Sequence, residues 1–187
     1  MARWAIAGAG AAAAAAWWCT DSAPYPYSQR WILDLQVPFL TNRRLDALLG
    51  VQPGERVLEI GPGTGLQALH VASQLGTAGR LDIVDIQPPM LDHVMRRAAA
   101  RGITTIVPTL ADASKLPFPD ASFDAAYLVT VLGEIPDPAA AVSELGRVLK
   151  PGGRLVVGEC FDRHFVSLVP LPFCNTQTGA GSRWAPG

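Results

Sequence analysis

The sequence predicts an α/β protein with a doubly wound, mostly parallel sheet and helices on both faces. Short apolar runs alternate with stretches of helical periodicity, as in repeated strand–helix units. A glycine cluster at Gly61, Gly63 and Gly65 separates the apolar run 57–60 from a helical pattern, the arrangement at which parallel sheets bind nucleotide-like ligands. Residues 125–131 are nearly all apolar, as expected for a strand buried on both faces.

Composition indicates one folded domain and excludes several classes of function. The chain has 187 residues, of which 49% are hydrophobic and 17% charged, with a net charge of -1. It therefore resembles neither a disordered chain nor a basic nucleic-acid-binding protein. Cys19, Cys160 and Cys174 are far apart and lack zinc-site spacing, which predicts a reducing compartment and no metal.

The first 50 residues divide into an apolar stretch and a connecting region. Residues 1–19 are rich in alanine, and residues 4–19 carry no charge. They are read as a tail, with a membrane anchor, a cleaved signal peptide and a wrongly chosen start as alternatives. If residues 4–19 are an anchor, the excess of arginines after them favours a folded domain that stays in the cytoplasm, at the inner face of the membrane. Residues 20–50 form a Pro-rich linker followed by one or two short helices.

The remaining pattern predicts alternating strands and helices in chain order. Prolines and glycines mark their ends, because proline suits the first helical turn and glycine follows the last. The predicted strands are residues 56–60, 81–85, 103–107, 125–131 and 155–158, and the predicted helices begin after Gly65, near Pro89 and at Pro138.

The glycine loop has features of a particular cofactor site. Glycine accepts positive φ and carries no Cβ, so a ligand can approach the backbone at Gly61, Gly63 and Gly65. Leu66 stands where a dinucleotide-binding motif has its last glycine. Glu59 suits a ligand with an ammonium group, met directly or through water, better than a pyrophosphate. The stretch resembles the first motif of class I S-adenosylmethionine (SAM)-dependent methyltransferases, which implies SAM as the cofactor.

Further cofactor contacts are expected after the later strands. Asp85 ends the second strand, where a carboxylate can accept both ribose hydroxyls, although it can also cap the next helix. The resemblance implies that Asp112, with Ala113 beside it, binds the adenine amino group, unless Asp112 is an exposed loop residue. It also adds Thr130, near the end of the fourth strand, to the cofactor-binding set.

A second stretch resembles a narrower family. Residues 116–124, LPFPDASFD, and the turn at 150–154 are similar to those of ubiquinone/menaquinone C-methyltransferase-like proteins. The resemblance extends from about residue 51 to 159 and implies a Rossmann-like SAM-binding domain over residues 51–169. It also implies two more strands, the last antiparallel to the fifth. We expect the chain to lack both, with an irregular tail at 170–187 and a fifth strand exposed for self-association.

The resulting functional prediction is a SAM-dependent methyltransferase acting on a small or lipid-like acceptor. Glu134 follows the fourth strand and is the one candidate for proton transfer in the core, with His164 as a second candidate. By resemblance, Tyr25, Tyr27 and Trp31 are candidates to close the site.

Two other classes of function are kept as alternatives. The apparent lack of C-terminal strands favours a degenerate, non-catalytic SAM-binding or scaffold protein. An NAD(P) oxidoreductase is disfavoured by Leu66 and Glu59.

Overall fold

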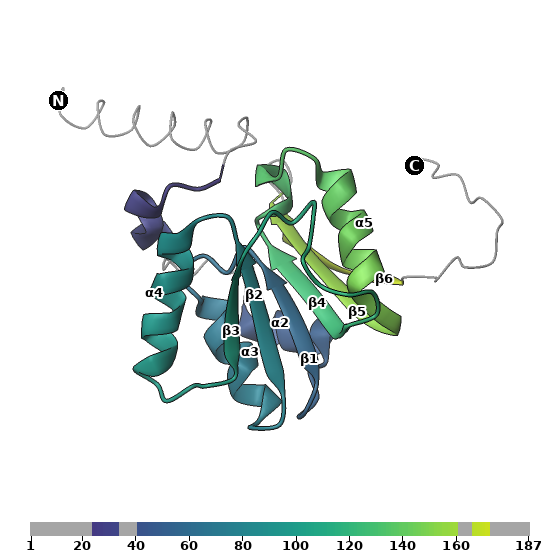
Figure 1. The fold of residues 1–187 in the computed structure, drawn as a ribbon, viewed down its shortest axis with the longest axis horizontal. Coiled ribbons are helices and arrows are strands. Elements are labelled where there is room, and N and C mark those ends of the chain that lie inside the picture. The colour runs from purple at the N-terminus through teal and green to yellow at the C-terminus, as the bar shows by residue number, and fades with distance from the viewer. Residues whose placement is uncertain (1–23, 34–40, 161–165, 173–187) are drawn as a thin grey trace.

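A six-stranded sheet in the order β3-β2-β1-β4-β5-β6 is the centre of the computed structural model, which describes residues 24–33, 41–160 and 166–172 (Figure 1). The strands are β1 (Arg56–Ile60), β2 (Arg80–Asp85), β3 (Ile106–Leu110), β4 (Phe123–Val129), β5 (Leu149–Cys160) and β6 (Val166–Pro172). The helices are η1 (Tyr27–Ile32), α2 (Asn42–Leu49), α3 (Leu66–Leu75), α4 (Pro88–Ala99), η2 (Leu132–Glu134) and α5 (Pro138–Val148).

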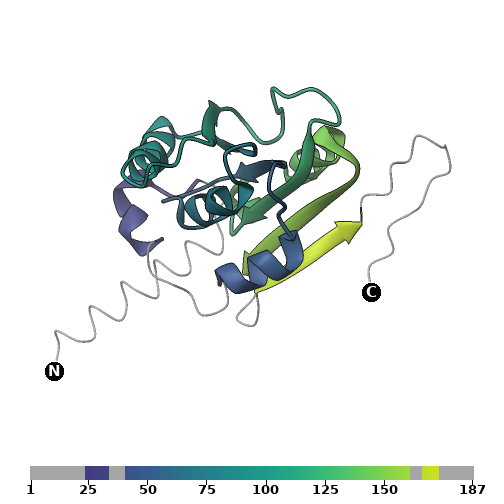
Figure 2. The same ribbon diagram turned by 90° about the horizontal axis from the view of Figure 1, so that it is seen from below.

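Helices cover both faces of this sheet, as predicted. α2, α3 and α4 bury Leu45, Leu75 and Val94 in one apolar cluster with residues from the sheet. α5 buries Leu145 and Val148 in a second cluster. Figure 2 shows α2 and α5 on opposite sides of the sheet. The doubly wound α/β fold class is confirmed.

The strand order creates a crevice at one edge of the sheet. From β1 the chain proceeds outward through β2 and β3, then returns to place β4 on the other side of β1. β1 to β5 are parallel, so the carboxyl ends of β1, β2 and β4 lie together. Ligands of open α/β sheets bind at this switch point.

The C-terminal end of the sheet differs from the prediction. β6 pairs antiparallel with β5 from Cys160↔Val166 to Arg154↔Pro172, so the expectation that β5 is an uncovered edge is wrong. The strand occupies the place that the resemblance gives to the antiparallel strand. A helix was expected to begin within 161–169, but residues 166–169 are extended, because Val166 and Val169 suit a strand and the prolines that follow do not suit a helix interior.

The predicted self-association loses its basis with this correction. Pro170 and Pro172 lie in β6, the new edge, where proline is tolerated and hinders pairing with a further strand. At the opposite edge, β3 is short and contains Pro108.

Several strand boundaries also differ from the prediction. β3 begins at Ile106, because Gly102 has φ +67° and the N–H of Ile103 donates to Ala98 O at 3.0 Å in the turn that ends α4. β4 ends at Val129, since Thr130 takes φ +56°. β5 extends further in both directions than predicted, from Leu149 to Cys160.

The predictions for residues 1–19 and for His164 fall outside the described residues. Within the described ranges, no helix is long and apolar enough to cross a membrane. Part of the expected linker is helical, because η1 begins at Tyr27.

A buried carboxylate joins the first two strands near their amino ends. Asp82 is fully buried and accepts hydrogen bonds from Arg56 Nε at 2.9 Å and Arg80 Nη2 at 2.6 Å. We expect Asp82→Asn to lower the free energy of unfolding by about 2 kcal/mol, less than for a fully buried ion pair because both arginines are partly exposed. Urea denaturation would measure the change, with exposed Asp92→Asn as the control. Equal midpoints for the two variants would contradict the prediction.

Candidate functional site

A cavity of about 690 Å³ opens at the carboxyl ends of β1, β2 and β4. Its volume lies within the usual range for small-molecule sites. The predicted site residues Gly61, Gly63, Asp85, Asp112, Ala113, Thr130 and Glu134 all line it. Glu59 and Gly65 lie outside the lining. Residues from four separate parts of the predicted fold thus meet at one place.

The glycine loop forms the floor of the cavity, and its shape requires glycine. Gly61 has φ +63°, and a Cβ there would lie 2.5 Å from Val131 Cγ2. Gly65 has φ +83° and would bring a Cβ to 3.0 Å from Val94 Cγ1. Both conformation and space therefore exclude larger residues. The turn leaves the backbone at Gly61 and Gly63 bare toward the cavity.

Glu59 is buried beside this loop rather than in the cavity. Only 3% of the residue is exposed, and its cross-strand neighbour is Tyr127. Within the part of the chain that the structure describes, neither Glu59 Oε2 nor the Tyr127 hydroxyl has a hydrogen-bond partner by distance and angle. Burial raises the pKa of Glu59 to about 8, with the Asp85 charge adding to the shift and Tyr127 opposing it. Its contact with an ammonium group stays a prediction.

Asp85 reaches the cavity from the end of β2. Its Oδ1 accepts the N–H of Gln87 at 2.8 Å, next to the start of α4. Burial raises the pKa of Asp85 to about 6, although backbone N–H groups of Ile86 and Gln87 partly offset this shift. The N-cap of α4 is Gln87, so Asp85 does not cap that helix; its side chain braces the turn before α4 and lines the cavity.

Sequence reasoning missed Ile86, the residue after Asp85. Ile86 lines the cavity and is 51% exposed, which is unusual for a large apolar side chain. Its exposed surface offers an apolar contact to a flat ligand group beside the Asp85 carboxylate. The sequence signal that could have indicated Ile86 was a large apolar residue directly after Asp85, the acid that ends β2.

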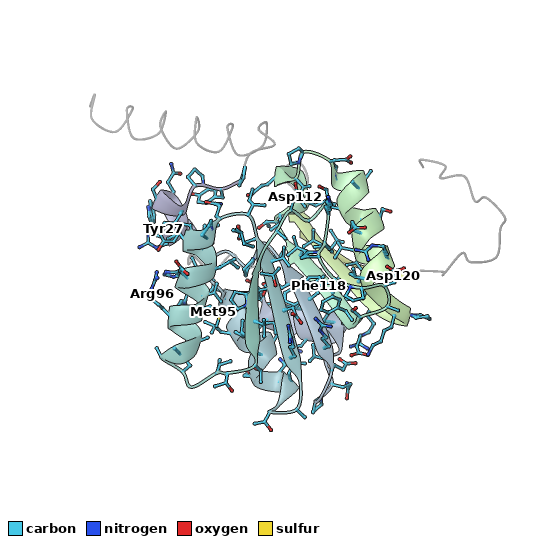
Figure 3. The ribbon with its side chains drawn as sticks, in the orientation of Figure 1. Tyr27, Met95, Arg96, Asp112, Phe118 and Asp120 are labelled. Atoms are coloured by element: carbon cyan, nitrogen blue, oxygen red, sulfur yellow. The ribbon has the colours of Figure 1, made fainter. Side chains whose placement is uncertain are left out.

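Asp112 and Ala113 form another part of the wall. Asp112 Oδ1 accepts the N–H of Ser114 at 2.8 Å and its hydroxyl at 2.7 Å. These bonds lower the pKa of Asp112 and keep it ionised. Figure 3 shows Asp112 at the end of the sheet away from Phe118 and Asp120, while Ala113 is buried next to it.

The end of β4 approaches the glycine loop through a strained turn. Thr130 has φ +56°, which is rare for a β-branched residue, and such strain is often found at functional sites. Its N–H donates to Gly158 O at 2.6 Å and its hydroxyl to Val129 O at 2.8 Å. The turn places Val131 against Gly61 and leads into η2, which carries Glu134.

The N-terminal segment contributes one aromatic residue to the cavity. Tyr25 lines it, and burial together with the Glu134 charge raises the pKa of the Tyr25 hydroxyl. Tyr27 instead packs on α4, where its hydroxyl accepts Arg96 Nη2 at 3.3 Å (Figure 3). Trp31 is 64% exposed and does not line the cavity. Of the three aromatic candidates, Tyr25 is therefore the one brought to the site.

Histidines are not part of the described cavity wall. His70 on α3 contacts Asp46 Oδ1 on α2 at 2.8 Å, and His93 on α4 packs beside Tyr27. Among the residues that the structure describes, no group of three or more His, Cys, Asp or Glu is placed to hold a metal ion.

A doubly wound sheet with a glycine loop and an acid after its second strand defines a nucleoside-binding domain. A protein-family model described as a methyltransferase domain matches residues 58–157. The chain belongs to this methyltransferase family. The cofactor of the family is S-adenosylmethionine, and the bare backbone of the glycine loop and the Asp85 carboxylate fit it.

Curated relatives share the resemblance seen in the sequence. The ubiquinone/menaquinone biosynthesis C-methyltransferase UbiE of Cupriavidus taiwanensis is 42% identical over 113 residues, 60% of this chain and 46% of the relative. The UbiE of Ectopseudomonas mendocina is 42% identical over 136 residues, 66% of this chain and 53% of the relative. The chain therefore spans about half the length of the curated relatives that it matches.

Solved structures support the same fold. A SAM-dependent methyltransferase from Aquifex aeolicus superposes with a TM-score of 0.66 over 79% of each chain, at 22% identity. The [4+2]-cyclase SpnF is 34% identical with a TM-score of 0.59, covering 63% of this chain and 43% of SpnF.

The buried carboxyl of Glu59 should destabilise the protein at neutral pH. Its pKa is 4.5 when exposed and about 8 in the folded chain, so folding takes up a proton between these values. The free energy of unfolding then falls as the pH rises from about 4.5 to 8. The Glu59→Gln variant carries a neutral amide at every pH. We expect its free energy of unfolding to exceed that of the unsubstituted protein by about 3 kcal/mol at pH 7 and by little at pH 4.5.

Urea denaturation at several pH values would measure this difference. A gain from Glu59→Gln that stayed the same from pH 4.5 to pH 8 would contradict the assignment of the effect to ionisation.

Proposed function

We propose that this protein binds SAM in the cavity and transfers its methyl group to a small, quinone-like acceptor. The observation that supports this most directly is that Gly61, Asp85, Asp112 and Glu134, predicted from separate motifs, line one cavity. Family membership supports the reaction class. The names of the matched relatives support the class of acceptor.

The cavity offers different chemistry along its wall for each part of the cofactor. The glycine loop suits the amino-acid end, since no side chain holds it away from the backbone. Asp85 can accept the two ribose hydroxyls, and Ile86 presents apolar surface to the adenine ring. Asp112 then supplies an acceptor for the adenine amino group. These placements use the residue types that line the cavity.

Methyl transfer demands positioning more than acid–base chemistry. The bound cofactor would supply an electrophilic methyl group on a sulfonium, from which a neutral thioether leaves readily. The protein's main task is to align the acceptor and to exclude water. A base is required only when the acceptor loses a proton, and Glu134 is the predicted group for that step.

The rest of the cavity suits a flat acceptor with polar substituents. Leu33, Ile135 and Pro136 provide apolar wall, while Asn42 and Gln67 provide amide groups. A quinone-like ring has both kinds of surface. Because a 34% identical structure is named as a cyclase, the assay must detect the methylated product itself.

Other features stay predictions from the sequence. The cytoplasmic location and a weak membrane contact through residues 4–19 belong here, as do the domain limits at residues 51–169. A lipid-like acceptor depends on that membrane contact.

Calorimetric binding of SAM tests the proposed cofactor site. We expect Asp85→Ala to weaken binding by about 10- to 100-fold, because a charged acceptor of two hydroxyl groups is lost. Exposed Asp92→Ala on α4 serves as the control and should bind like the unsubstituted protein. Equal SAM affinity in Asp85→Ala would contradict the proposed ribose contact. No binding by folded, unsubstituted protein would favour a degenerate protein.

The raised pKa of Asp85 predicts a pH dependence of binding. Ribose hydroxyls donate to the ionised carboxylate, so affinity should fall as the pH drops through about 6. Between pH 7.5 and 5.5 we expect the Kd for SAM to rise about fourfold. Calorimetry of Asp85→Asn provides the comparison, since this variant should lose that dependence. An identical pH profile in both proteins would exclude Asp85 as its source.

A further inference from the structure

One residue of the N-terminal segment is held through its backbone from both sides of the cavity. The N–H of Tyr25 donates to Glu134 Oε2 at 3.0 Å, and Gln87 Nε2 donates to Tyr25 O at 2.9 Å. Glu134 follows β4 and Gln87 follows β2, the two strands that flank β1. Tyr25, itself 8% exposed, thus bridges the two sides of the switch point.

The segment around this bridge, residues 24–33, forms one wall of the cavity. Pro24, Tyr25 and Leu33 all line it. A Cβ on Gly63 would lie 3.3 Å from Leu33 Cδ1, so this end of the segment lies over the glycine loop. Between these points, Tyr27 is held against α4 by Arg96. We call residues 24–33 the strap.

We propose that Glu134 and Gln87 form a clamp on Tyr25 that keeps the strap closed over the bound cofactor, and that Glu134 acts there as a positioning residue. The inference rests on the proposed function, because it assumes that the cavity binds SAM. It assigns a different role to Glu134 from the proton transfer predicted from sequence. The carboxylate already accepts a backbone N–H, which is a fixed structural task.

The clamp should control how fast the cofactor product leaves. Closed segments over active sites retain ligands and exclude water, and their opening often limits turnover. Opening the strap requires both hydrogen bonds to Tyr25 to break. Losing either bond should therefore speed release to a similar extent, and losing both should speed it further, because the remaining bond no longer holds the strap.

The amide of glutamine separates the two roles of Glu134. In Glu134→Gln the side-chain oxygen still accepts the N–H of Tyr25, but it no longer acts as a base at neutral pH. In Glu134→Ala both abilities are lost. Gln87→Ala removes the other half of the clamp and leaves Glu134 intact.

Stopped-flow release of S-adenosylhomocysteine, with turnover measured beside it, tests the clamp. We expect release about tenfold faster in Glu134→Ala and in Gln87→Ala, as for one lost hydrogen bond, and about 100-fold faster in the double variant, which loses both. Release from Glu134→Gln should stay within about twofold of the unsubstituted protein. Asp137→Ala is the control for general destabilisation, because it removes the cap of α5 at Ala140 N without touching the strap.

Three results would overturn the clamp. The first is unchanged release in Gln87→Ala. The second is turnover lost equally in Glu134→Gln and Glu134→Ala with unchanged release, which would make Glu134 a base. The third is faster release in Asp137→Ala to the same extent as in the clamp variants. Failure of the unsubstituted, folded protein to bind S-adenosylhomocysteine would instead refute the proposed function. If Glu134→Ala does not fold, Gln87→Ala and Glu134→Gln still decide between the roles.

Discussion

The close contact between the glycine loop and its neighbours is the constraint on which the site depends. Val131 occupies the space that a side chain at Gly61 would need, and Val94 does the same at Gly65. The end of β4 and the helix α4 can therefore lie directly against the loop. Thr130 takes a strained conformation to deliver Val131 to this contact. The loop, the β4 turn and α4 form one interlocked unit, and the cavity is the space left above it.

Carboxylates near this unit are arranged at a cost to stability. Glu59 is buried and Asp85 is largely shielded from water, so burial raises the pKa of both. A fold selected only for stability would place neutral groups there. Strained and poorly satisfied groups cluster where a ligand completes the interactions. Asp85 and the strained Thr130, both in the cavity lining, therefore support the assignment of the cavity as the functional site independently of sequence similarity.

The sequence predicted the centre of the fold better than its edges. Strands β1, β2 and β4 each carry a short run of apolar residues, so local pattern located them, together with Asp85 at the end of β2 and Glu134 after β4. β6 was missed, because the run from Val166 to Pro172 becomes a strand only beside β5. Ile86 was missed since exposure of an apolar residue depends on what surrounds it. Glu59, predicted to meet the ligand, lies beside Tyr127 and outside the cavity lining, and its contact with the ligand stays a prediction.

Glu134 shows why a residue's position alone does not define its role. Sequence order placed an acid after β4, beside the expected reaction centre, and the structure places Glu134 in the cavity wall. The hydrogen bond from Tyr25, 109 residues earlier in the chain, was invisible to any local pattern. Because methyl transfer from a sulfonium needs alignment first, a carboxylate that holds the wall in place contributes to the reaction without moving a proton. The clamp and the cavity then belong to one mechanism, in which closure by the strap supplies the alignment.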